Sequence, residues 1–531
     1  MEKVFRYSFL LCAAALLPAC AGEPDLEPDS SPVQEDCVYM DVGLSFSSGE
    51  VRTRSNTGDP SDGYVTSDDG TEPGKDRENA IAEVLLLIAD TQDSNIAAGL
   101  LETSGDGLDF VIPVPFRQLK DHAGEEVHVY VFCNPTDKLK SLAVNTPEGS
   151  LPSDFKDMEH TLQDFTEDPA WTDGHFIMSN ARMYTSVLPD DWSDYRSVSD
   201  PFPLVGEDIQ VERSVARVDY RTVRTDNTYP VSSSAADPDD TDNPGVMIRL
   251  ESAAFFNVGR SFYYLRRVAG ENLSGITLCG AETQDNYVVD TGAEYKLDIS
   301  GGWDGKSGYY YSNIEDPDSW EWTDLSDLED TEEDNVWGGD AGNTVGYHIW
   351  RYITENAAPS RESQVWSVST GIAFKAKIVA GSGCDQALAD VLGKGEEKIY
   401  VYDGILYGTW EMTREAGEQD ADLRVAWNAV ENNGLSLSDA GFTEYTPVAG
   451  EYVCYYFYRI VHNDDGADAS AVPGPMKYAV VRNNVYKIAV EAVTAFGLTD
   501  NTPTEDEYSY MMVTVDVVPW VDREYEIVID E

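Results

Sequence analysis

The stretch that decides the fold class is Cys37-Val38-Tyr39-Met40-Asp41-Val42-Gly43-Leu44-Ser45-Phe46. Apolar side chains alternate here with Tyr, Asp, Gly and Ser, which is the period of two expected for a β-strand with one buried face. The apolar positions are Val38, Met40, Val42, Leu44 and Phe46. Because such a face must be covered by other elements, the sequence predicts a β-domain around this strand.

The rest of the chain shows many short strand signals separated by turn residues. Strands are predicted at 84–88, 127–132, 209–220, 478–481, 485–493, 511–518 and 525–529, and helices only at 386–393 and 423–432. The polar stretches 47–79, 232–245 and 316–343 are predicted to be exposed loops. We therefore predict an all-β chain of two β-sandwich domains with a few short helices, divided near residue 210.

Composition excludes several classes of partner. The 531 residues include 36 Lys and Arg against 97 Asp and Glu, so the net charge is −61. Nucleic acid and anionic lipid surfaces both require clustered basic residues, and the sequence has no such cluster. Hydrophobic residues make up 42% and aromatic residues 11%, which is too much for a disordered acidic chain.

The first thirty residues predict export and lipidation. Lys3 and Arg6 precede an apolar run at 7–17, which is too short to span a bilayer. The sequence Leu17-Pro18-Ala19-Cys20 that follows resembles a bacterial lipobox, in which the cysteine thiol is acylated and residues 1–19 are removed. The acidic stretch 21–29 resembles the surface-export signal of Bacteroidetes lipoproteins, and it can also be a solvated spacer.

No reactive site emerges from the remaining residues. The cysteines after Cys20 are far apart without paired spacing, so we expect mostly buried free thiols. The six histidines include no HExxH, and His128 is expected to be a partnered sheet residue. The acidic segment 237–242 lacks the Gly and Glu of a calcium loop. We expect no metal, no cofactor and no enzyme activity.

Several segments in order resemble the fimbrillins of Bacteroidetes, the type V pilus subunits, and in particular the minor-fimbrillin branch. They lie mainly in residues 345–530, and the acidic insertion at 316–343 departs from the pattern. The segments are the lipobox, Val211-Glu212-Arg213-Ser214-Val215-Ala216-Arg217-Val218, Arg351-Tyr352-Ile353-Thr354-Glu355-Asn356, 371–377, a hairpin at 399–408, Tyr458-Arg459-Ile460-Val461-His462-Asn463, 478–488 and Val517-Val518-Pro519-Trp520. The resemblance implies two transthyretin-like sandwiches, a lipidated outer-membrane precursor delivered by lipoprotein export machinery, and a trypsin-like protease that removes the first strand.

The same resemblance implies that subunits then polymerise by strand exchange with copies of themselves and with other pilus subunits. We predict cleavage after Arg54, or alternatively after Arg52, because both lie in a Gly-, Ser- and Asp-rich stretch of the kind that proteases cut. The replacement strand must have the alternation of the first. The candidates are Val513, Val515 and Val517, or Tyr525, Ile527 and Ile529, which can equally be the last hairpin of the second sandwich.

The predicted organisation is a signal peptide at 1–19, a lipidated propeptide with the removable strand at 20–54, an N-terminal sandwich at 55–210 and a C-terminal sandwich with the donor segment at 211–531. Two alternatives stay open. The 11 Trp and 30 Tyr can form sugar platforms of a surface glycan-binding lipoprotein, although most aromatic residues of a β-sandwich lie in its core. The chain can also be a pilus anchor or tip subunit.

Overall fold

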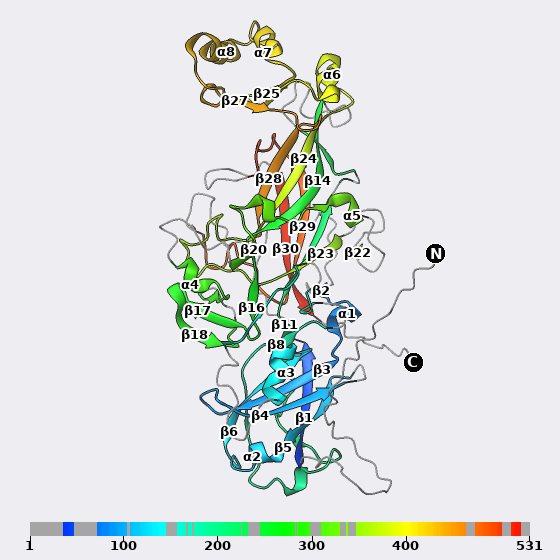
Figure 1. The fold of residues 1–531 in the computed structure, drawn as a ribbon, viewed down its shortest axis with the longest axis vertical. Coiled ribbons are helices and arrows are strands. Elements are labelled where there is room, and N and C mark those ends of the chain that lie inside the picture. Colours follow the sequence, from blue (N-terminus) through cyan, green and yellow to red (C-terminus); the bar gives the residue numbers. More distant parts are fainter. Residues whose placement is uncertain are drawn as a thin grey trace, which may run out of the picture.

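The computed structural model describes residues 36–46, 72–103, 107–144, 157–165, 168–171, 175–222, 224, 226–231, 245–281, 283, 285–297, 309–329, 336–337, 347–462, 473–501 and 511–521. Figure 1 shows an elongated arrangement: one β-domain at one end, a second in the middle, and a small unit with helices at the other end. Strands dominate and the helices are short, so the prediction of an all-β chain of two sandwiches with few short helices is confirmed.

The N-terminal domain is a nine-stranded sheet. Its strands are β1 (Cys37–Phe46), β3 (Glu83–Ala89), β4 (Asn95–Glu102), β5 (Asp109–Pro115), β6 (Glu126–Cys133), β8 (Met178–Asn180), β9 (Tyr184–Val187), β10 (Phe202–Pro203) and β11 (Ile209–Arg213). The order is β10-β1-β11-β8-β6-β3-β4, with β5 on β1 and β9 on β6. Strand β4 packs on β5 so closely that a Cβ at Gly99 would lie 2.6 Å from the Pro113 carbonyl oxygen. The sheet therefore curls back over an apolar core. Two short helices join its strands, α2 (Phe116–Leu119) and α3 (Asp137–Val144).

The C-terminal domain is a sandwich of a six-stranded and a five-stranded sheet. The first has the order β2 (Glu72–Pro73), β30 (Met511–Val521), β29 (Asn484–Val493), β12 (Ala216–Thr222), β23 (Tyr347–Ile353) and β22 (Val336–Trp337). The second has the order β13 (Thr228–Pro230), β14 (Val246–Phe256), β24 (Gly371–Ala380) and β28 (Val453–Arg459), with β21 (Thr323–Asp324) on β14. Aromatic pairs join the layers, because Phe255 stacks on Trp350 at 4.2 Å between ring centroids.

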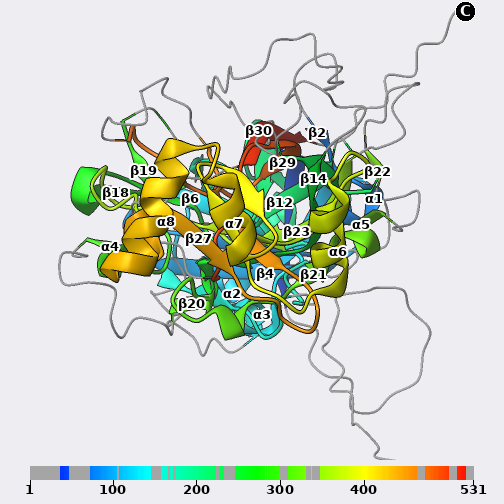
Figure 2. The same cartoon turned by 90° about the horizontal axis from the view of Figure 1, so that it is seen from above.

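Smaller elements surround this sandwich. A side lobe contains β16 (Ser261–Tyr263), β17 (Arg267–Gly270), β18 (Ser274–Leu278), β19 (Tyr287–Val288) and α4 (Ala293–Lys296). An end unit contains α6 (Gln386–Lys394), β25 (Ile399–Tyr402), β26 (Ile405–Tyr407), α7 (Trp410–Ala416), α8 (Ala421–Asn433) and β27 (Phe442–Tyr445). Figure 2 shows the helices of this unit lying across one end of the molecule. The other α-helices and strands of the described residues are α1 (Asp76–Asn79), β7 (Glu159–Thr161), β15 (Val258–Gly259), β20 (Tyr310–Ser312) and α5 (Leu325–Glu329).

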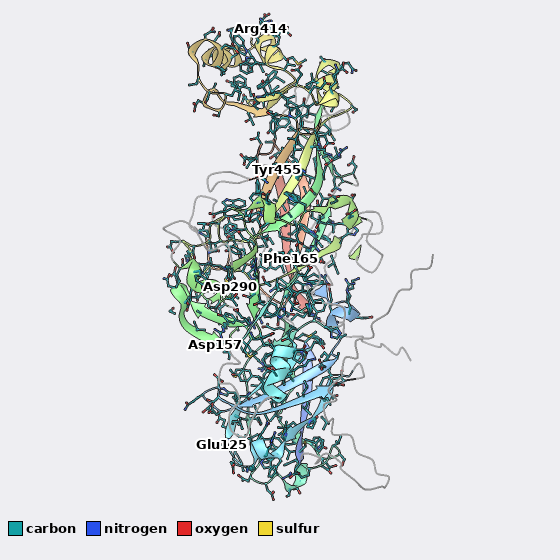
Figure 3. The ribbon with its side chains drawn as sticks, in the orientation of Figure 1. Glu125, Asp157, Phe165, Asp290, Arg414 and Tyr455 are labelled. Carbon is teal, nitrogen blue, oxygen red and sulfur yellow. The ribbon has the colours of Figure 1, made fainter. Side chains whose placement is uncertain are left out.

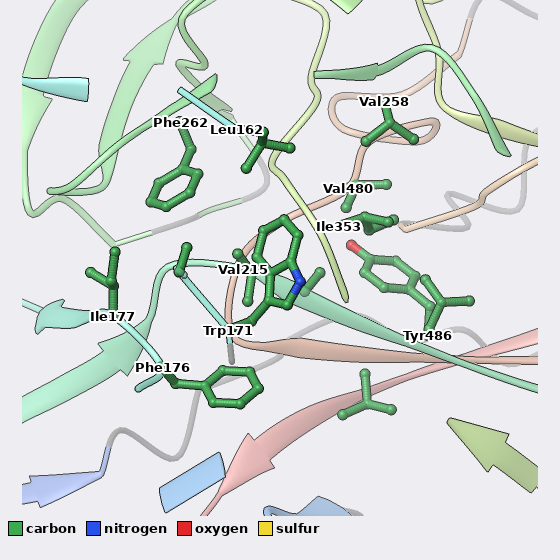
Figure 4. Packing of buried hydrophobic residues seen from close by; sticks show 14 of the residues in the cluster. Leu162, Trp171, Phe176, Ile177, Val215, Val258, Phe262, Ile353, Val480 and Tyr486 are labelled. Atoms are coloured by element: carbon green, nitrogen blue, oxygen red, sulfur yellow. The ribbon is translucent and has the colours of Figure 1, made fainter. Parts of the chain in front are cut away.

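The two domains share one continuous apolar core. The chain passes from the first to the second between β11 and β12, through Ser214 and Val215, both buried. Figure 4 shows Val215 beside Trp171, with Phe176 on the side of the first domain and Ile353 on the other. Segments also cross over: β7 of the first half pairs antiparallel with β16 of the side lobe, and β2 pairs with β30.

Most of the predicted elements are present, and three expectations need correction. The structure confirms the strands expected at 84–88, 127–132, 485–493 and 511–518. It also confirms the hairpin at 399–408 and the helices at 386–393 and 423–432. The single strand expected at 209–220 is two strands, β11 and β12, in different sheets. Within 478–481, Tyr478 ends a turn and Val480 forms an isolated bridge with Asn356, so the expected strand is not formed. The polar stretches 47–79 and 316–343 are not loops throughout, because the first ends in β2 and α1 and the second contains β21, α5 and β22.

Candidate functional site

Strand β1 presents a regular buried face to the N-terminal core. Val38 and Met40 are fully buried, Val42 and Leu44 are 2% and 3% exposed, and Phe46 is half-buried against the same core. The opposite face carries Asp41, which is exposed. Burial of the four enclosed side chains contributes roughly 6–12 kcal/mol as an upper bound, at ~1.5–3 kcal/mol for each. The residues of β1 that are apolar in the alternating sequence are therefore the ones that face the core.

Both edges of β1 are hydrogen-bonded to other strands. Residues Cys37 to Gly43 pair antiparallel with β5. On the other edge, Met40 and Asp41 pair with β10, and Leu44 to Phe46 pair with β11, both in the parallel direction. Loss of β1 would therefore expose the backbone edges of three strands, and such edges pair readily with another chain.

The first described residue before β1 makes a surface contact. The Asp36 carboxylate accepts a hydrogen bond from the Arg196 guanidinium at 2.6 Å, and its side chain is 73% exposed. The same guanidinium lies over the Phe116 ring at 3.5 Å. Exposed ion pairs of this kind contribute little to stability, typically less than about 1 kcal/mol. The start of β1 is thus held mainly by its strand pairing.

At the other end of the chain, β30 is built into the six-stranded sheet. It pairs antiparallel with β29 from Met511↔Val493 to Pro519↔Asn484. Within the described part of the chain, β2 pairs with its other edge at Trp520 and Val521 in the parallel direction. Val513, Val515 and Val517 all lie in this strand, and Val513 is half-buried. Tyr525, Ile527 and Ile529 lie outside the described residues, as do Cys20, Arg52 and Arg54.

Residues 47–71, which contain Arg52 and Arg54, connect a strand of the first domain to a strand of the second. Before them β1 lies in the first domain; after them β2 lies on β30 in the second, followed at once by α1. This helix has a capping box, in which the Lys75 backbone amide donates to the Glu78 carboxylate at 2.7 Å. The segment predicted to be cut thus joins the core strand of one domain to the edge of the other.

A buried ionic network fixes α1 at the junction of the domains. The Glu78 carboxylate is fully buried, and it accepts from the Arg217 guanidinium at 3.1 Å and from the Tyr352 hydroxyl at 2.6 Å. Arg217 also donates twice to Asp219, each time at 2.9 Å. Burial alone would raise the pKa of Glu78, but Arg217 and the Tyr352 hydroxyl hold it below the ordinary value.

Arg213 extends this network to the last strands. Its guanidinium donates to the Glu78 backbone carbonyl at 3.1 Å and to the Asn483 side-chain oxygen at 3.2 Å, and it also contacts Asn79. Asn483 lies in the turn before β29, the strand that carries β30. Residues from α1, β11, β12, β23 and the β29 turn therefore meet at one buried point.

This network was missed at the sequence level because 47–79 was predicted to be exposed. Two signals could have revealed it. Lys75 and Glu78 have the spacing of a capping box. Arg213 and Arg217 stand among buried positions, and a buried arginine requires a carboxylate partner.

The described part of the chain offers little for other chemistry. Cys133, Cys279 and Cys454 are buried free thiols, as expected, and Cys384 is a half-buried one. His128 is partnered by Asp93 at 2.6 Å, as expected for a sheet residue. Among these residues, no three His, Cys, Asp or Glu side chains form a group that could hold a metal, and residues 237–242 lie outside them. None of the described helices is both long enough and apolar enough to cross a membrane.

Comparison with known proteins gives one family match. Residues 450–526 match the family model described as "Major fimbrial subunit protein type IV, Fimbrillin, C-terminal". This segment contains β28, β29 and β30. No curated protein matches the chain.

Solved structures show weaker similarity over most of the chain. A putative cell adhesion protein from Parabacteroides distasonis is 13% identical, with 92% of this chain and 98% of that chain covered and a TM-score of 0.42. A fimbrilin (fimA) from Porphyromonas gingivalis is 14% identical, with 93% and 100% covered and a TM-score of 0.40. The tip fimbrial protein Mfa3 from the same organism is 10% identical, with 91% and 100% covered and a TM-score of 0.39. These scores are low, so the family match at residues 450–526 is the firmer finding.

Proposed function

The chain is of the fimbrillin type, and we propose that it is a structural subunit of a cell-surface fimbria that supports adhesion. Fimbrillins are structural proteins and not enzymes. In this proposal, the precursor reaches the outer membrane as a lipoprotein acylated at Cys20. One acyl chain gives only marginal attachment, whereas the triacyl modification implied by the resemblance would hold the precursor firmly.

The proposed maturation step is proteolytic removal of β1 by an arginine-specific, trypsin-like protease. Cleavage after Arg54, or after Arg52, separates β1 from β2 and α1. The observation that carries the proposal is the double-edged pairing of β1, with four enclosed apolar side chains. A vacated site of this kind has an apolar groove and open strand edges, and both are filled by a strand of the same alternation.

The proposed assembly step is insertion of a C-terminal strand from a neighbouring subunit. Of the two candidate segments, Val513, Val515 and Val517 already belong to the β29–β30 ladder, so donating them would break those hydrogen bonds. Tyr525, Ile527 and Ile529 come after the last paired residue of β30, so their donation costs none of that ladder. We therefore favour residues 525–529 as the donor, with β30 as the base that carries it.

Replacement of both arginines tests the maturation step. The variant Arg52→Ala/Arg54→Ala should keep residues 20–54 and stay monomeric, as seen by N-terminal sequencing and electron microscopy of surface material. Each single variant identifies which bond is cut. Arg117→Ala, at an exposed arginine on α2, is the matched control and should be cut and assembled normally. Normal fibres from the double variant would contradict the maturation step, and a retained monomer with polysaccharide affinity in the wild type would favour a glycan-binding lipoprotein instead.

Deletion of residues 522–531 tests the donor. Because β30 ends at Val521, this truncation leaves the β29–β30 and β2–β30 pairs complete. The truncated protein should be folded and cut but unable to form fibres in electron micrographs. Asp522→Ala, within the same segment but outside its apolar set, should assemble as the wild type does. Abundant fibres from the truncation would assign the donor role to another strand.

A further inference from the structure

A lysine, an aspartate and an asparagine meet in the interior of the side lobe. Lys296 ends α4, Asp290 (labelled in Figure 3) follows β19, and Asn356 follows β23. All three are buried, with 0%, 2% and 1% exposure respectively. The Lys296 Nζ atom lies 2.5 Å from Asp290 Oδ2 and 2.5 Å from Asn356 Oδ1. An amine is therefore held against a carboxamide and a carboxylate at the same time.

Burial favours the neutral form of the Lys296 amine. Removal from water lowers the pKa of Lys296, and this effect outweighs the opposing influence of Asp290. In a dry site, transfer of the ammonium proton to the carboxylate replaces two buried charges by two neutral groups. A neutral lysine amine is a nucleophile, whereas an ammonium ion is not.

The aspartate is held in place to take and return that proton. Its carboxylate accepts from the Gly292 amide at 2.8 Å, from the Ala357 amide at 2.7 Å and from the Tyr309 hydroxyl at 2.9 Å. Ala357 adjoins Asn356 in the chain, so the carboxylate is positioned by the same segment that carries the carboxamide. This arrangement places a proton carrier within hydrogen-bond reach of the nucleophile, as general base catalysis requires.

The nitrogen of the carboxamide is surrounded by acceptors. Asn356 Nδ2 donates to the carbonyl oxygens of Asn257 at 2.9 Å and Val368 at 2.8 Å, and to Thr370 Oγ1 at 2.8 Å. A carboxamide has two N–H bonds, so this site offers more acceptors than the amide can use. The same acceptors suit a departing ammonia or ammonium, which has more N–H bonds.

We propose that Lys296 and Asn356 become joined by an isopeptide bond within the chain. The Nζ atom attacks the Asn356 carboxamide carbon and forms a C–N bond, while the bond from that carbon to Nδ2 breaks. The Lys296 ammonium first gives one proton to Asp290, and the attacking nitrogen loses a second proton after the C–N bond forms. The Nδ2 atom takes up both protons, the first returned by Asp290, and leaves as ammonium. No oxidant, reductant or co-reactant is consumed. Asp290 acts as the proton carrier.

The bond ties the side lobe to the end of β23. The two residues are 60 positions apart in sequence, so the crosslink closes a long loop. Crosslinks that close long loops stabilise mainly by restricting the unfolded chain. The inference does not depend on polymerisation, because it concerns one subunit and can hold whether or not the chain forms fimbriae.

Peptide mapping of the unaltered full chain tests the proposal. The protein is denatured and digested with trypsin, which cannot cleave after a lysine whose side-chain nitrogen is acylated. The expected product is peptide 268–306, uncut after Lys296, joined to peptide 352–361, with the summed mass reduced by one ammonia. Lys487 is also buried and is the internal control, since cleavage after it should be complete. Complete cleavage after Lys296, with the two peptides at their sequence masses, would overturn the proposal.

Two variants assign the roles. Lys296→Arg removes the nucleophile while keeping a buried cation, and it should abolish the joined product. Asp290→Asn removes the proton carrier and should reduce the joined product at least tenfold. An undiminished product in Asp290→Asn would refute the assigned role of Asp290. If either variant fails to fold, the map of the unaltered chain still decides whether the bond exists.

Discussion

The elements on either side of residues 47–71 are held by different kinds of contact. Strand β1 is held by strand pairing on both edges and by apolar side chains such as Met40 and Val42. Helix α1 is held by a buried carboxylate, Glu78, that meets the guanidinium of Arg217 and the hydroxyl of Tyr352. The first kind of contact is general, because any strand with matching alternation supplies it. The second is specific, because a buried arginine without its carboxylate is strongly unfavourable.

This difference suits a cut between the two elements. In the proposed mechanism β1 leaves and is replaced by another strand, while β2 and α1 stay. Apolar burial and backbone pairing allow such replacement, as strand addition in other β-proteins does. The ionic network keeps the new N-terminal region attached at the junction of the two domains, where Arg213 also reaches the turn before β29. Substitutions in α1 and in β1 test this difference.

The largest effect is expected at the junction. Glu78→Gln keeps the size of the side chain but removes the carboxylate that accepts from the buried Arg217 guanidinium. Breaking a buried ion pair on one side typically costs roughly 3–5 kcal/mol, and we expect a loss of that order in the free energy of unfolding. Guanidinium chloride denaturation of the full chain measures it.

The exposed pair at the start of β1 is the control for that variant. Asp36→Asn removes the partner of Arg196, but the Asp36 side chain is 73% exposed. Water solvates the guanidinium once the pair is lost, so the expected change is below about 1 kcal/mol. Equal losses for the two variants would mean that the junction network does not hold α1 more firmly than a surface contact.

A smaller and conditional effect is expected in β1. Met40→Ala leaves a cavity in the N-terminal core of the uncut chain, at a cost of roughly 2–5 kcal/mol. After cleavage and loss of β1, the same substitution should have no effect on the remaining chain. Thermal unfolding of the uncut and cut forms, each with and without the substitution, measures both. A loss that persists in the cut form would show that β1 stays in place.

Asp41→Ala is the matched control on the same strand. Its side chain is exposed on the opposite face, while the Asp41 backbone carbonyl accepts from the Leu204 amide and is unaffected by the substitution. Surface substitutions of this kind usually change stability by less than about 0.5 kcal/mol. A large loss would mean that both faces of β1 are structurally important, and the apolar face alone would no longer explain its retention.

The spacing of apolar residues predicts an element well where the apolar residues are also the buried ones. The alternation in 37–46 became β1, and α6 and α8 are bounded by the Asp385 and Asp420 N-caps and by glycines at positive φ. Helix α7 was missed although Thr409 caps it. The single strand expected at 209–220 was wrong because every residue in it except the half-buried Gln210 is buried, so nothing local marks the change of sheet at Ser214.

The sequence does not predict which distant segments pair with one another. Strand β7 meets β16 about a hundred residues later, and no local pattern selects that partner. Residues 478–481 have strand-forming side chains, yet Val480 only bridges Asn356, which belongs to a buried cluster assembled from four separate segments. Glu78 is similar, because its partners Arg217 and Tyr352 lie more than a hundred positions away.

The last expected effect is a loss of the Glu78 contribution in acid. The pKa of Glu78 is lowered by Arg217 and Tyr352 despite burial, so its contribution to stability is complete above the ordinary value of 4.5 and is lost as pH falls through the lowered value. Each unit of lowering corresponds to about 1.4 kcal/mol. The whole chain also changes in acid, because its 97 carboxyl groups become protonated and its net charge of −61 falls in magnitude. The informative quantity is therefore the difference in unfolding free energy between wild type and Glu78→Gln. It should be constant from pH 7 to about pH 5 and shrink below the ordinary pKa. A difference that stays constant at still lower pH would mean that the Glu78 charge does not hold the junction, and that the side chain acts only through its hydrogen bonds.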